Sequence, residues 1–135
     1  VRERFFAQNV YVDNFYQDAL VVTGRAREWL ARKPRAPFFL LVHYMDPHDP
    51  YMHIPYDGRG IARVTNPHPP ASERDRMHQL YQENVGYLDE HLATLWQDLR
   101  DLGLWDNTVI ALTADHGEEF YEHSGWWHGT TLYEE

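Results

Sequence analysis

Two short apolar runs, separated by a long helical pattern, constrain the fold of this chain more than any other feature. The runs Phe38–Tyr44 and Thr108–Thr113 consist almost entirely of apolar and β-branched residues, and turn residues precede each of them. Runs of this length are typical of strands buried on both faces, as in a parallel sheet between helices. Because a helical segment lies between them, we expect two parallel strands with a right-handed connection. The sequence therefore predicts an α/β fold.

The strongest helix is predicted between the two runs, over residues 72–102. Ser72 is a plausible N-cap, and Gly103 suits the position that follows a helix C-terminus. Apolar residues recur there in alternating steps of four and three, which is the spacing of a helix with one buried face. This apolar seam comprises Tyr81, Val85, Leu88, Leu92, Leu95, Leu99 and Leu102.

A further helix and a long loop complete the predicted organisation. Apolar residues at helical spacing predict a helix over residues 14–33, with Asp13 as its N-cap, and Pro34 ends it. Residues 51–70 are rich in Pro, Gly, Asn and His, so we expect them to form a long surface loop.

Composition excludes several classes of function. The 135 residues carry 21 Asp and Glu against 12 Lys and Arg, a net charge of -9 that would repel nucleic acid phosphates. The chain has no Cys and therefore no disulfide, no thiol nucleophile and no Cys-ligated zinc. No apolar run approaches the roughly 20 residues that cross a membrane, and a signal peptide pattern is absent.

Because the chain starts at Val1 rather than Met and ends abruptly at Glu135, we expect a piece of a longer protein.

Polar clusters follow both apolar runs directly. Residues 46–51 follow the first run, and residues 115–123 follow the second. In open α/β sheets, ligands bind beyond the carboxyl ends of the strands, where such clusters meet. The sequence therefore predicts that both clusters line one crevice.

The pair Asp115 and His116 is a candidate metal site. A carboxylate oxygen and an imidazole nitrogen suit Zn²⁺, Mn²⁺ or Ca²⁺, and Gly117 allows the sharp turn that lets both side chains face one ion. The alternative is that Asp115 caps a helical turn beginning near Glu118. The acidic residues Glu118, Glu119 and Glu122 are expected to form a solvated face.

Two further histidines are candidates for contact with a substrate. His48 lies between two prolines that restrict its backbone, although an ordinary Pro-rich turn is the alternative. His128 follows two tryptophans, and there an imidazole can donate to an anionic oxygen or protonate a leaving group. We expect His43, inside the first apolar run, to be a hydrogen-bonded core residue, and the carboxylates of Asp46 and Asp49 to cap turns.

Taken in order, these segments resemble the central part of a sulfatase, a family of the alkaline phosphatase superfamily. The resemblance rests on Pro37–His43, Asp46–Tyr51, Tyr81–Asp89, Leu102–Thr108, Thr113–Glu119 and His128–Glu135. It implies a mixed, mainly parallel sheet flanked by helices, with one metal site at the edge of the sheet. Residues 1–135 would then be a fragment of a single sulfatase-like catalytic domain, truncated at both ends.

The resemblance also implies roles for the candidate residues. Asp115 and His116 correspond to the late pair of metal ligands, with Ca²⁺ favoured and Mn²⁺, Mg²⁺ or Zn²⁺ as alternatives. His48 corresponds to the histidine that contacts the sulfate or the leaving group. His128 takes a place often held by a lysine that neutralises sulfate oxygens. The implied substrate is a small-molecule or glycan sulfate ester, and no membrane segment or nucleic acid is involved.

The sulfatase nucleophile is a formylglycine made from Cys or Ser in a Cys/Ser-x-Pro-x-Arg motif, which this chain lacks. The resemblance therefore places the nucleophile upstream and predicts a parent hydrolase whose fragment is inactive alone. The nearest alternative is a phosphodiesterase, a phosphonate monoester hydrolase or a phosphoethanolamine-type transferase of the same superfamily. Another is a non-catalytic α/β binding module that uses Tyr121, Trp126 and Trp127 as contact residues.

Overall fold

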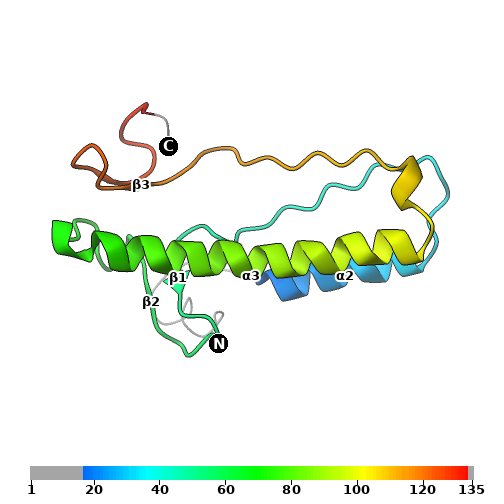
Figure 1. The fold of residues 1–135 in the computed structure, drawn as a ribbon, viewed down its shortest axis with the longest axis horizontal. Helices are drawn as coiled ribbons and strands as arrows, with labels where there is room; N and C mark the ends of the chain where they lie inside the picture. The colour runs from blue at the N-terminus through cyan, green and yellow to red at the C-terminus, as the bar shows by residue number, and fades with distance from the viewer. Residues whose placement is uncertain (1–16, 134–135) are drawn as a thin grey trace.

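Two helices that run side by side in the same direction dominate the structure, a computed structural model that describes residues 17–133 (Figure 1). Helix α2 spans Ala19–Ala31, and helix α3 spans Arg74–Asp101. The side chain of Asp18 caps α2 by accepting a hydrogen bond from the backbone N–H of Leu20 at 2.8 Å. The expected N-cap Asp13 lies outside the described residues. Within them the helix begins at Ala19 and ends at Ala31, so residues 17–18 and 32–33 of the predicted span are not helical.

The prediction of a long helix is confirmed by α3 within two residues at its start. The 3-10 helix η1, Ala71–Glu73, precedes it, so Ser72 lies inside a helical turn and is not the N-cap. Gly103 follows the C-terminus with a φ of +67°, as expected for that position. A second 3-10 helix, η2, spans Trp105–Asn107 and turns the chain back along α3.

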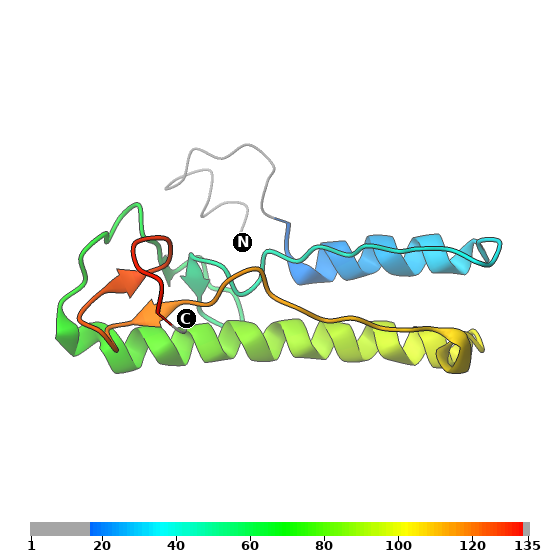
Figure 2. The same cartoon turned by 90° about the horizontal axis from the view of Figure 1, so that it is seen from above.

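The two apolar runs return beside the helices as extended segments, and both run opposite to α2 and α3 (Figure 2). Neither run belongs to a strand within the described residues, so the predicted parallel pairing is not formed there. A strand requires a neighbour about 4.8 Å away to accept and donate its backbone hydrogen bonds, and within residues 17–133 neither run is paired with such a neighbour. Phe39 and Val109 are 87% and 97% exposed, because no described residue covers their outer faces.

Short antiparallel pairs provide all the strands of the described part of the chain. Strands β1, Tyr51–Met52, and β2, Gly60–Ile61, form one pair. Strands β3, Glu119–Phe120, and β4, Trp126–Trp127, form the other. Residues 51–70 are therefore not a plain surface loop, because Tyr51 and Met52 are fully buried against α3.

The described hydrophobic core has one large cluster at each end of α3 and a small third cluster of Met52 and Ala62. One cluster joins β1, β2, β3 and β4 to the first turns of the helix and contains Tyr51, Ile61, Met77, Leu80, Phe120, Trp126 and Trp127. The other packs α2 against the second half of α3 and contains Ala26, Leu30, Leu95 and Leu99, covered by Phe38, Leu40 and Val42. Among the helices of residues 17–133, none combines the length and apolar character needed to cross a membrane.

The buried face in the first half of α3 differs from the predicted seam. Asn84 is buried there, whereas the neighbouring Val85 is exposed. The side-chain amide of Asn84 donates to the carbonyl of Met52 at 2.8 Å and accepts from its N–H at 3.4 Å. Both backbone groups of a buried strand residue are thus satisfied by a helix side chain, which explains why a polar residue occupies this core position.

Candidate active site

Three imidazoles from three loops gather near the start of α3. His48 follows the first extended run, His116 follows the second, and His128 follows β4. The ring centroids are 6.1 Å apart for His48 and His116, 5.0 Å for His48 and His128, and 4.1 Å for His116 and His128. The polar clusters after the two runs therefore meet, as expected, although no sheet joins the runs.

A buried carboxylate supports this cluster. The Glu118 side chain is only 6% exposed; its Oε1 lies 3.1 Å from His128 Nδ1, and its Oε2 accepts a hydrogen bond from the Tyr51 hydroxyl. Burial first, and then the charge of Glu118, raise the pKa of Tyr51, so the phenol stays protonated and donates. The tyrosine ring stacks on Trp127 with centroids 5.8 Å apart. Tyr51 and Glu118 thereby hold the His128 ring in one orientation.

The expectation that Glu118 and Glu119 belong to a solvated face is wrong. The Glu119 side chain is 1% exposed, and its Oε1 accepts from the backbone N–H groups of His123 and Gly125 at 2.9 Å each. A Cβ at position 125 would lie 2.5 Å from Glu119 Oε2, so only glycine allows this close approach. Glu119 therefore organises the turn between β3 and β4 that leads to His128.

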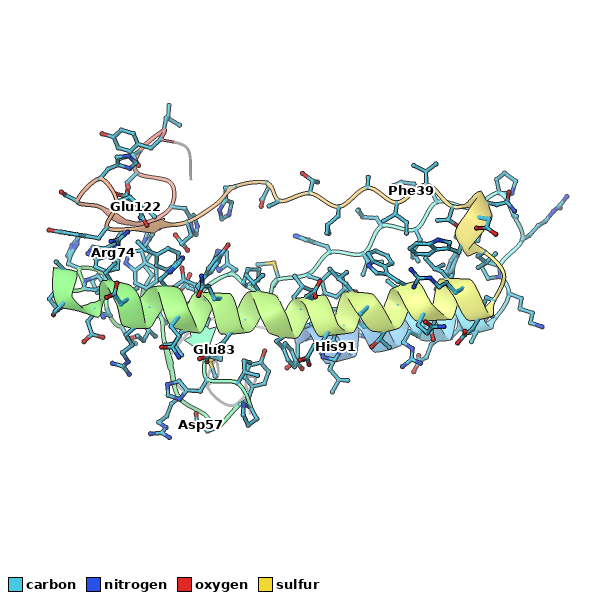
Figure 3. The ribbon with its side chains drawn as sticks, in the orientation of Figure 1. Phe39, Asp57, Arg74, Glu83, His91 and Glu122 are labelled. Atoms are coloured by element: carbon cyan, nitrogen blue, oxygen red, sulfur yellow. The ribbon has the colours of Figure 1, made fainter. Side chains whose placement is uncertain are left out.

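Glu122, the third acidic residue of this run, is exposed as expected. It pairs with Arg74 of α3 at 3.4 Å, and Figure 3 shows the two side chains at the same end of the helix. Its carboxylate also accepts from the backbone N–H of Phe120 at 2.6 Å. Partial burial acts to raise the pKa of Glu122, but these hydrogen bonds and Arg74 outweigh it and hold the pKa below its usual range.

Asp115 lies at the open side of the cluster, with a side chain that is 88% exposed. Its Oδ1 is 3.8 Å from His116 Nε2, while His116 Nδ1 lies 2.8 Å from the carbonyl oxygen of Gly117. No helical turn follows residue 115, so the alternative role of Asp115 as a helix cap is wrong. An accessible carboxylate oxygen beside an imidazole nitrogen fits a divalent cation, with room for further ligands.

Arg63 connects the loops that carry His48 and His128. Its backbone N–H donates to the Asp49 carboxylate at 2.9 Å, and its guanidinium donates to the carbonyl of His128 at 3.0 Å. His48 Nδ1 lies 2.9 Å from the carbonyl oxygen of Asp49. Sequence reasoning missed Arg63, Glu118 and Tyr51 as supporting residues, because no local pattern indicates which loop each of them contacts.

The burial of His43 and of the two tryptophans differs from what the sequence predicted. Asp46 is buried and accepts a hydrogen bond from the Tyr56 hydroxyl at 3.1 Å, whereas His43 is exposed and is not a core residue. His43 faces outward because the first run alternates, with Phe38, Leu40 and Val42 facing the helices. Of the three contact residues in the binding-module alternative, Tyr121 is exposed, whereas Trp126 and Trp127 are buried in the core and offer no contact surface.

Comparison with known proteins places this chain in a family. The sulfatase family model matches residues 3–135, so the chain belongs to the sulfatase family, and the family implies an α/β fold of the alkaline phosphatase type. The resemblance recognised from the motifs is thereby confirmed.

The chain is similar to several curated proteins. It is 30% identical over 129 residues to iduronate 2-sulfatase from Mus musculus, which covers 67% of this chain and 23% of that protein. It is 24% identical over 147 residues to the multifunctional alkaline phosphatase superfamily protein PehA from Trinickia caryophylli. That match covers 80% of this chain and 29% of PehA. Iduronate 2-sulfatase from Homo sapiens is 39% identical over 57 residues, a match that covers 42% of this chain and 10% of that protein.

The chain spans less than a third of the length of these relatives. No solved structure gives a significant match to it.

Proposed function

We propose that residues 1–135 form part of the catalytic domain of a metal-dependent sulfuric ester hydrolase. The observation that carries the proposal is the convergence of His48, His116 and His128, in a chain of the sulfatase family. The substrate would be a sulfate ester of a small molecule or a glycan. The domain would extend beyond this chain at both ends, as the short coverage of the relatives supports.

Asp115 and His116 would hold one divalent ion together with acidic residues from elsewhere in the domain. When bound, the ion would polarise the ester and offset the negative charge on its oxygens. The sulfatase resemblance favours Ca²⁺, with Mn²⁺, Mg²⁺ or Zn²⁺ as alternatives. The exposed carboxylate of Asp115 is accessible to such an ion without any rearrangement of the core.

His48 and His128 would contact the sulfate oxygens or the leaving group. Arg63 and Glu118 keep these two side chains close together, because they connect the supporting loops by hydrogen bonds. A protonated imidazole at these positions would donate a charge-assisted hydrogen bond to an anionic oxygen.

The nucleophile would be a formylglycine contributed from outside residues 1–135. This chain has no Cys and no Ser-x-Pro-x-Arg segment from which that group is made. We therefore expect residues 1–135 alone to be inactive, whatever substrate is offered.

Assays on the intact protein that contains this chain test the proposal. Aryl sulfate hydrolysis is measured for the parent and for His48→Ala and Asp115→Ala, with the exposed His68→Ala as the matched control. We expect a loss of about 10²-fold or more in kcat/KM for the first two variants and no change for the control. Equal activity of all four proteins would contradict the assigned roles.

A second candidate is hydrolysis or transfer of a phosphoryl or phosphonyl group within the same superfamily. It is favoured by the similarity to the superfamily protein PehA, which extends over 80% of this chain. Measuring phosphate diester and phosphonate monoester hydrolysis beside sulfate ester hydrolysis separates the two candidates. A Thr in place of the Cys/Ser-x-Pro-x-Arg motif in the upstream sequence would favour the second.

A further inference from the structure

The three clustered histidines form a candidate set of metal ligands that does not include Asp115. Each of His48, His116 and His128 offers one ring nitrogen, and these nitrogens all lie within 4.8 Å of one another. Three neutral imidazoles are ligands typical of Zn²⁺ and of Co²⁺, Ni²⁺ or Cu²⁺, whereas Ca²⁺ prefers oxygen. The cluster therefore suits a different class of ion from the one that the sulfatase resemblance favours.

Backbone carbonyls set the tautomers of two of the rings. His48 Nδ1 lies 2.9 Å from the carbonyl oxygen of Asp49, and His116 Nδ1 lies 2.8 Å from that of Gly117. A carbonyl oxygen only accepts, so Nδ1 carries the proton in both rings and the lone pair lies on Nε2. Metal-binding histidines donate their second N–H in this way, which fixes the ring and raises its basicity as a ligand.

A carboxylate sets the tautomer of the third ring. His128 Nδ1 lies 3.1 Å from Oε1 of the buried Glu118, which the Tyr51 hydroxyl holds from the other side. Carboxylate, histidine and metal in a row form a recurring arrangement at zinc sites. All three imidazoles thus have Nδ1 hydrogen-bonded to an oxygen, from which we infer that Nε2 is the ligand atom.

We propose that His48, His116 and His128 bind a borderline transition ion such as Zn²⁺ as a three-imidazole site, independently of Asp115. Nitrogens at the corners of a triangle with 4.8 Å sides lie about 2.8 Å from its centre, against about 2.0–2.1 Å for a Zn–N bond. Binding requires each ring to move inward by less than about 1 Å, a small shift for loop side chains. The bound ion would occupy the imidazoles that our proposed function assigns to the ester, so Zn²⁺ would inhibit the hydrolase.

Metal titration of the intact protein, freed of metal beforehand, tests this inference. Zn²⁺ binding is measured by calorimetry, and Co²⁺ is added as a probe whose visible absorption reports tetrahedral coordination. We expect His48→Ala and His128→Ala each to weaken Zn²⁺ binding by about tenfold or more. The controls His68→Ala and Asp115→Asn should change it less than about threefold, and circular dichroism checks that each variant is folded.

Two results would overturn the inference. One is Zn²⁺ binding that persists in His48→Ala and His128→Ala but is lost in Asp115→Asn, since the ion would then sit on the Asp115 and His116 pair. The other is no Zn²⁺ binding by the folded parent protein. The inference and the proposed function fail separately, because Zn²⁺ binding by an intact protein without esterase activity would contradict only the function.

Discussion

Replacing Asn84 with alanine should destabilise the protein although the residue contributes no apolar surface to the core. Its amide satisfies both the N–H and the carbonyl of Met52, a residue with no exposed surface. The substitution leaves these two buried groups without their partner, and each orphaned group costs about 1–3 kcal/mol. We therefore expect Asn84→Ala to lower the free energy of unfolding by about 3 kcal/mol.

The neighbouring Val85→Ala is the matched control, since both changes lie in the same turn of α3. Val85 is 40% exposed, so its truncation should cost less than about 1 kcal/mol. Urea unfolding of the intact protein, followed by tryptophan fluorescence, measures both free energies. Hydrogen exchange at Met52 should also accelerate in Asn84→Ala alone. A larger loss for Val85→Ala than for Asn84→Ala would refute this reasoning and favour the seam predicted from the sequence.

Two further predictions concern the turn between β3 and β4. Gly125→Ala places a methyl group against Glu119 and should lower the melting temperature, whereas Gly86→Ala, with nothing within 4 Å of the added carbon, should raise it slightly. Because the folded pKa of Glu122 lies below its unfolded value, its stabilising contribution is present above the unfolded pKa and is lost as the pH falls through the folded one. Glu122→Gln should therefore reduce the loss of melting temperature that the parent protein shows as the pH falls through the acidic range. An equal loss in the variant and the parent would contradict the role of Arg74 and the backbone hydrogen bonds.

Local patterns were sufficient for α3, whereas they predicted too long a span for α2. The apolar spacing and Gly103 located α3 nearly to the residue, because helix hydrogen bonds join residues four apart and need no distant partner. The same spacing placed Val85 on the buried face where the structure has Asn84. Only the position of β1 against the helix shows why a polar residue belongs there.

The histidine cluster shows which features of the site local sequence predicts and which it does not. Their chemistry, and the expectation that the loops after the two apolar runs meet, followed from residue types and order along the chain. The burial of Glu118 did not, because a carboxylate is buried only where hydrogen-bond donors satisfy it, and here one donor is the hydroxyl of Tyr51, which lies far away in the sequence.

The sequence by itself determined the family, helix α3 and the candidate residues that follow the two apolar runs, because each of these depends on neighbours along the chain. The tertiary structure decided that Glu118 is buried against Tyr51 and which loops Arg63 connects. These features depend on contacts between residues far apart in sequence, whose distances no local pattern encodes.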